Sequence, residues 1–156
     1  MIIIMAETIV NGLDDALDLF VKQLEKSTKL NVVEKQTITQ AGGAVFRDHL
    51  REETSAKHRS NYNDKTRGHA ADNIDMYSPR VNSSKFGTLF GDTLVGWKTR
   101  YHALNMQRLN DGTRFIKADH FVTNLRNDPT VRSEILAAEK AAYSKIMQQH
   151  ENKEGD

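Results

Sequence analysis

Asp128 followed by Pro129 is the sequence feature that most constrains the fold, because the pair marks the start of a long helix. An aspartate before a helix accepts hydrogen bonds from its first backbone N–H groups, and proline is favoured at the first helical position. Apolar and alanine side chains then recur at helical spacing as far as about residue 150, at Val131, Ile135, Ala138, Ala142 and Ile146. This narrow stripe predicts tight packing on a sheet or on another helix, followed by a frayed polar tail over residues 151–156.

The N-terminal part of the chain carries two further helical patterns. One covers about residues 12–27, where apolar side chains recur at three- and four-residue spacing, at Leu13, Leu17, Phe20, Val21 and Leu24. The other covers about residues 32–54 and has Gly42 and Gly43 in its middle. Two glycines cost a helix about 1 kcal/mol each relative to alanine. The helix therefore either breaks at this pair or is packed too closely for side chains, and we favour close packing or a kink.

The middle of the chain has the pattern of a long loop followed by short strands. Residues 55–69 are almost without apolar side chains, which predicts a loop of unusual length that is functional or ordered by a partner. Strand patterns cover residues 73–77, 86–90, 93–97 and 113–117, and a helical pattern covers residues 101–109. The sequence therefore predicts a single α+β domain over residues 1–156. It has N-terminal helices, a small antiparallel β-sheet in the middle and a long C-terminal helix packing on it.

Composition limits the chemistry that the chain can perform. None of its 156 residues is cysteine, so disulfides, thiol catalysis and zinc–thiolate sites are excluded. The formal net charge of +1 argues against nucleic-acid binding by bulk charge alone. No apolar run approaches the roughly 20 residues that cross a bilayer, so we expect no membrane partner.

The six histidines do not form a recognisable metal motif. None of them is spaced as HxH, HxxxH or HExxH, and the chain also lacks GxSxG and the glycine-rich phosphate-binding motifs. A structural or surface histidine is the better interpretation at each position. We therefore expect no enzyme, no cofactor and no metal site. A metal-dependent hydrolase using His69, His102 and His120 is kept as a third hypothesis.

Charge is distributed unevenly along the chain. Residues 79–118 have a net charge of +5 and residues 119–156 one of −2. This polarity suits head-to-tail contact between copies, and ordinary charge scatter explains it equally well. Residues 47–67 hold six bases and four acids around Tyr62, a pattern that can contact phosphates and stack on bases, although a solvated or partner-bound loop is the better interpretation. The candidate partner-contact residues are Arg47, Arg51, Lys57, Arg59, Tyr62, Lys65, Arg67, Arg100, Arg108, Arg114 and Phe121.

A turn is predicted at Asp111-Gly112-Thr113, because glycine can take the positive φ that a tight reversal requires. This turn is one of five short motifs that occur in order between residues 69 and 121. They are His69-Ala70-Ala71-Asp72-Asn73-Ile74, Leu94-Val95-Gly96-Trp97, Tyr101-His102-Ala103, Asn110-Asp111-Gly112-Thr113 and Lys117-Ala118-Asp119-His120-Phe121. Together with the long C-terminal helix, over about residues 69–146, they resemble the neck or tail-completion proteins of long-tailed bacteriophages, a head–tail joining family.

The resemblance implies a structural role in the virion. Copies would form a homo-oligomeric ring between the capsid connector and the tail, next to head-closure and tail-terminator proteins, with DNA passing through the lumen. It also implies that Gly112 and Thr113 fix a turn and that residues 55–69 contact a neighbouring ring. Trp97, Phe115 and Phe121 would be core or interface anchors. The alternative from the residues alone is a small DNA-associated protein that uses the basic loop 47–67 and the basic middle segment.

Overall fold

The computed structural model describes residues 30–61, 65–78 and 91–154. Three predictions concern residues outside these ranges, namely the helix over residues 12–27, the strand over residues 86–90 and the contact role of Tyr62. Residues 32–156 form a compact unit by their internal contacts, and the architecture below is that of this unit. No helix within the described ranges is long and apolar enough to cross a membrane.

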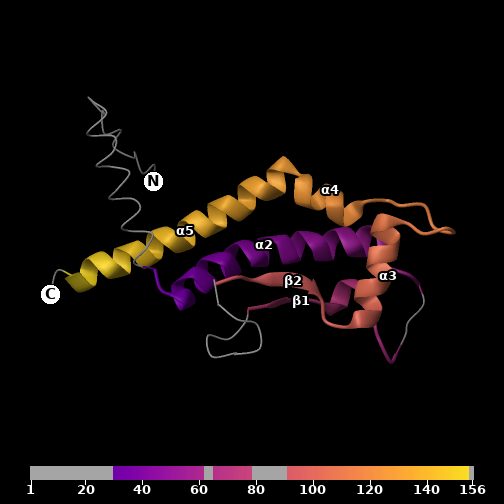
Figure 1. The fold of residues 1–156 in the computed structure, drawn as a ribbon, viewed down its shortest axis with the longest axis horizontal. Coiled ribbons are helices and arrows are strands. Elements are labelled where there is room, and N and C mark those ends of the chain that lie inside the picture. Colours follow the sequence, from indigo (N-terminus) through magenta and orange to yellow (C-terminus); the bar gives the residue numbers. More distant parts are fainter. Residues whose placement is uncertain (1–29, 62–64, 79–90, 155–156) are drawn as a thin grey trace. The chain divides into compact units, whose positions relative to one another are not determined.

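Two long helices are the largest elements of the fold. Helix α2 (Val32–His58) and helix α5 (Pro129–Glu154) lie side by side and antiparallel (Figure 1). Two pairs link the helices, Glu34 with His150 and Glu134 with His49, each with 2.6 Å between the carboxylate oxygen and the histidine Nε2. The predicted α+β order is confirmed. The C-terminal helix was expected to pack on the sheet, but it packs on α2, which itself covers the sheet.

The glycine pair of α2 explains how the helix can be covered on two sides. A Cβ atom added to Gly42 would lie 2.5 Å from Glu139 Oε1 on α5, and one added to Gly43 would lie 2.9 Å from Thr93 Cγ2. The helix is continuous through both residues. Close packing, one of the two interpretations favoured above, is therefore confirmed, and the break is wrong. Helix α2 lies between α5 and the sheet (Figure 1).

The sheet consists of two antiparallel strands in the described residues. A short 3₁₀-helix η1 (Ala71–Asn73) leads into β1 (Ile74–Tyr77), which pairs with β2 (Leu94–Trp97). Ile74 lies opposite Trp97 in the register and is buried towards α2, as is expected for alternate residues of a strand with one covered face. The strand predictions over residues 73–77 and 93–97 are thus confirmed with slightly shorter bounds.

Two short helices pack near the C-terminal end of α2. Helix α3 (Arg100–Asp111) is capped by Thr99, whose hydroxyl accepts a hydrogen bond from His102 N, and α4 (Phe121–Asn127) follows it. The core lies where α2, the sheet, α3 and α4 meet, and its buried side chains are Leu50, Ile74, Met106 and Phe121. The helix predicted over residues 101–109 is confirmed.

The structure corrects three local predictions. Helix α2 continues to His58, so residues 55–58 form its last turn and the loop begins after them. Helix α5 continues to Glu154, beyond the expected end near residue 150. The strand expected over residues 113–117 is absent, because Thr113 Oγ1 accepts hydrogen bonds from the backbone N–H groups of Phe115 and Ile116 and closes a turn instead.

Candidate interaction surface

Helix α3 presents one stripe of side chains to the core and the opposite stripe to solvent. His102, Met106 and Asn110 recur every fourth residue and are buried. The opposite side is exposed and carries the basic or apolar residues Arg100, Tyr101, Leu104 and Arg108, together with Gln107 and the acid Asp111. A helix with this division holds its outer residues in fixed positions relative to one another, which suits recognition of a partner.

The loop that precedes η1 contacts helix α3 through Arg67. The Arg67 guanidinium carbon lies 4.3 Å from the centroid of the Tyr101 ring, a cation–π contact. The Arg67 carbonyl accepts from the Asn73 side-chain amide at 3.1 Å, and His102 Nε2 lies 3.1 Å from the same oxygen. Because a carbonyl only accepts, the His102 proton is on Nε2. Arg67 therefore extends the basic surface of α3.

Residues 112–118 form a tight projection that we call the Phe115 turn. Gly112 has φ of 79°, and a Cβ atom there would lie 2.9 Å from Ala118 N, so this position requires glycine. Thr113 N donates to the Ile116 carbonyl at 2.8 Å across the turn. Gly112 has the predicted positive φ, but Asp111 is the last residue of α3, so the turn begins one residue later than predicted. The Phe115 side chain at its tip is 86% exposed, and the Arg114 guanidinium lies 5.2 Å from the centroid of its ring.

Asn110 holds the base of this turn, a role that the sequence did not indicate although the residue opens the Asn110-Asp111-Gly112-Thr113 motif. Its side-chain oxygen accepts from Val122 N at 2.9 Å and Thr123 N at 3.1 Å, which caps the start of α4. The backbone of α3 adds two bonds, from Asp119 N to the Leu109 carbonyl and from His120 N to the Asn110 carbonyl. The Phe115 turn therefore projects from a firmly joined corner between α3 and α4 (Figure 1).

The basic residues at the start of the 47–67 segment do not form a loop surface. Arg47, Arg51 and Lys57 lie on α2, and the first and last of them pair with neighbouring acids, Asp48 at 2.7 Å and Glu53 at 2.5 Å. The hydrogen bond to Glu53 raises the pKa of Lys57. Arg59 similarly pairs with Asp72 at 3.3 Å. The prediction of one basic loop over residues 47–67 is therefore wrong, because its first half is helical and several of its charges are neutralised locally.

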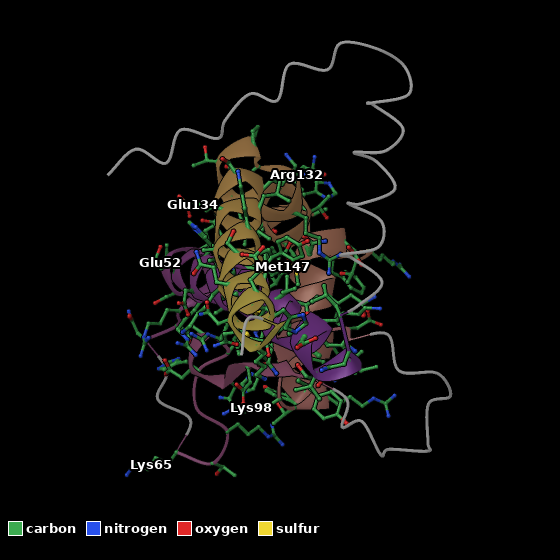
Figure 2. The ribbon with its side chains drawn as sticks, turned by 90° about the vertical axis from the view of Figure 1, so that its left-hand side faces the viewer. Glu52, Lys65, Lys98, Arg132, Glu134 and Met147 are labelled. Carbon is green, nitrogen blue, oxygen red and sulfur yellow. The ribbon has the colours of Figure 1, made fainter. Side chains whose placement is uncertain are left out.

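The bases of α3 and the Phe115 turn have no such neutralisation. Arg100, Arg108, Arg114 and Lys117 are exposed, and none makes an ion pair with any residue that the structure describes. We call the surface that joins α3 to the turn the α3 face, and it comprises Arg100, Tyr101, Leu104, Arg108, Arg114, Phe115 and Lys117. Lys65 is exposed on the loop that carries Arg67, and Figure 2 shows it extended away from the helices.

Phe121 is not a contact residue. Its side chain is 0% exposed, and its ring packs edge-on against His58 at 4.5 Å and Trp97 at 6.4 Å between centroids. Of the two roles left open for Phe121, the structure therefore supports the core anchor, and its place among the partner-contact candidates is wrong. Phe115, for which core and interface were both open, is exposed.

The histidines of the third hypothesis are only partly brought together. His69 and His102 line a small cavity of about 170 Å³ together with His58, whereas His120 is exposed at the start of α4 and does not line it. Nε2 of His58 lies 2.8 Å from Asp119 Oδ2 but without hydrogen-bond geometry. Among the described residues, no group of three or more His, Asp or Glu side chains is arranged to hold a metal ion.

Two open grooves lie on the surface at the level of the sheet. The first, of about 450 Å³, is the outer face of the two strands, where Tyr77 and Leu94 are more than half exposed opposite each other. The second, of about 550 Å³, runs between α2, the start of β2, α4 and α5, and we call it the α2–β2 groove. Both are shallow and open, which suits a protein contact better than an enclosed small-molecule site.

Comparisons with protein families, with curated proteins and with solved structures found no match to this chain.

Proposed function

We propose that this chain is a structural virion protein of a tailed bacteriophage that forms a ring in the neck, between the capsid connector and the tail. The five ordered motifs between residues 69 and 121 support this proposal through their resemblance to the head–tail joining family. In this role the protein is not an enzyme and needs no cofactor. Its partners are further copies of itself and the head-closure and tail-terminator proteins on either side.

The observation that carries the proposal is the exposed Phe115 on a hydrogen-bonded turn that also carries Arg114 and Lys117, two bases without an ion pair among the described residues. Aromatic residues and arginine are the side chains that contribute most at protein interfaces. Burying a phenylalanine gains about 1.5–3 kcal/mol relative to leaving it in water, so a side chain that is 86% exposed on a fixed support has a large contact energy still to gain. A subunit that completes its burial on assembly has such a residue.

Immunogold microscopy on intact particles tests the proposal. An antibody against the full chain is applied to purified particles of the phage whose genome carries this sequence, and tail-less heads from the same preparation serve as a control for non-specific labelling. We expect label at a single point between head and tail. Intact particles without label, under conditions where the antibody detects the denatured protein in the same preparation, would contradict the proposal.

A second function is favoured by the charge of the α3 face. Four exposed bases, Arg100, Arg108, Arg114 and Lys117, lie on it without acidic partners in the described ranges, beside the aromatic Tyr101 and Phe115. Such a face can bind DNA in the lumen of a ring or in a small DNA-associated protein. Binding of the purified chain to DNA should then fall with salt, and Arg100→Ala with Arg108→Ala should reduce the logarithmic salt slope by about 2. Absence of binding at low salt would exclude this function.

A further inference from the structure

The α2–β2 groove has a lining that differs from the rest of the surface. Its floor is the glycine pair of α2, and its apolar wall is formed by Phe46, Val95 and Ile135, with Leu94 at its rim. Leu94 lies opposite Tyr77 on the outer face of the strands, where it is 59% exposed, and it borders the groove from that side. An exposed large apolar side chain beside a hollow in the surface is typical of a contact site.

The groove also carries two acidic groups without partners. Asp92 lies at the entrance to β2, and Glu139 projects from α5 over Gly42. Neither makes a hydrogen bond or ion pair with the residues that the structure describes. Burial raises the pKa of Glu139, because removal from water disfavours the ionised carboxylate. Arg126 is the one base of the lining.

The Phe115 turn is complementary to this groove in its apolar surface and in its charge. It offers one large apolar side chain at its tip, and Arg114 and Lys117 beside it, while residues 113–118 contain no acid. The groove offers apolar walls and two carboxylates against one base. An aromatic anchor in an apolar hollow, with bases meeting unpaired acids at the rim, is the pattern of a specific protein contact.

We infer that the Phe115 turn of one copy docks in the α2–β2 groove of the next copy. The inference rests on the proposed ring and names the contact that builds it. The turn lies beyond α3 at one end of α2, and the start of β2 lies towards the other end (Figure 1). Because the two surfaces are different patches, the contact is heterologous, and repetition produces a closed ring when the rotation between copies closes.

Cross-linking between two single-cysteine variants tests the contact. The chain has no natural cysteine, so Lys117→Cys in one tagged copy and Leu94→Cys in an untagged copy are the only reactive thiols when the two full-length proteins are mixed. A short thiol-reactive linker should join them, in solution or in assembled particles. Val33→Cys is the matched control, because Val33 is as exposed as Leu94, 57% against 59%, and lies outside the groove lining. Equal cross-linking of the control, or no cross-link in either setting, would overturn the inference.

Association of copies, measured by sedimentation, gives an independent readout. Phe115→Ala should weaken this association at least tenfold.

A charge exchange tests the polar part of the contact. Asp92→Lys and Arg114→Asp should each weaken the association of copies, and the double variant should restore it, because the two charges of the pair are then exchanged. The effect of each single change on folding is checked by its unfolding midpoint. Failure of the double variant to restore association, with both single variants folded, would overturn the inference.

The outcomes separate this contact from the proposed function. Gold label in the neck together with no Lys117–Leu94 cross-link in the same particles would contradict the contact and leave the neck role standing. A cross-link between copies together with unlabelled particles would support the contact and contradict the neck role. A Leu94→Cys thiol that does not react with a small maleimide in the isolated chain would mean that this rim of the groove is already covered, and this would also overturn the inference.

Discussion

Replacing Gly43 by alanine tests the packing of α2 against the sheet. The added Cβ would lie 2.9 Å from Thr93 Cγ2 and 3.3 Å from Met76 Sδ. Thr93 cannot turn its methyl group away freely, because its hydroxyl lies 2.9 Å from both the Thr39 and the Ser78 hydroxyls. The new methyl group therefore meets a neighbour that is held in place.

The expected change in stability is a difference of two terms. Alanine is about 1 kcal/mol better than glycine in a helix interior, which favours the variant. Overpacking a tight contact costs about 1–3 kcal/mol, which opposes it. Gly43→Ala should therefore lower the free energy of unfolding by about 1 kcal/mol. Gly42→Ala should be less harmful than Gly43→Ala, because its obstacle is the side chain of Glu139, which can swing aside.

Urea unfolding of four proteins checks this reasoning. They are the wild type, Gly43→Ala, Thr93→Ser and the double variant. Serine removes the Cγ2 methyl and keeps the hydroxyl, so the alanine at position 43 should cost less in the Thr93→Ser background, with a coupling energy of about 0.5–3 kcal/mol. Gly43→Ala alone raising the free energy of unfolding by about 1 kcal/mol, as at an open helix position, would refute the argument for close packing.

Three further predictions concern other parts of the fold. Phe115→Ala should change the free energy of unfolding by less than about 0.5 kcal/mol, because the side chain is 86% exposed, and a larger loss in urea unfolding would mean that it packs within its own chain. Asn110→Ala should cost about 1–3 kcal/mol in the same assay, because two backbone N–H groups at the start of α4 lose their acceptor, and Asn105→Ala is a control from the same helix. The pKa of Glu139 is raised in the folded state, so its ionisation destabilises the protein at neutral pH, and this cost disappears below the ordinary value of 4.5. Glu139→Gln should therefore raise the thermal midpoint at pH 7 and lose that advantage in acid, and an advantage that is independent of pH would contradict this account.

The parts of the fold that local rules decide could be predicted from the sequence. Asp128 Oδ1 accepts from Thr130 N at 2.7 Å and Pro129 opens α5, as the N-cap pattern predicts. Gly42 and Gly43 pointed to close packing, but not to the elements that cover them. That information depends on contacts between residues far apart in the chain, which no local pattern contains.

The wrong predictions also arose from contacts between residues far apart in the chain or from local hydrogen bonds that the sequence pattern does not show. Residues 113–117 have the bulk of a strand, but a strand needs a neighbour, and the Thr113 hydroxyl offers the backbone a turn instead. Phe121 and Phe115 are the same residue type six positions apart, and only the tertiary structure decides that one is buried and the other exposed. The neutralised bases of α2 likewise resemble the unpaired bases of α3 in sequence. The α3 face could therefore not be separated from the other basic residues before the structure was known.

A cryo-electron microscopy reconstruction of the neck in intact particles would show the proposed ring and its contact in one map. We expect a ring of copies between connector and tail, in which each copy shows the antiparallel pair of α2 and α5 and places Phe115 in the α2–β2 groove of its neighbour. A fully traced neck in which every ring is built by other chains would contradict the proposal.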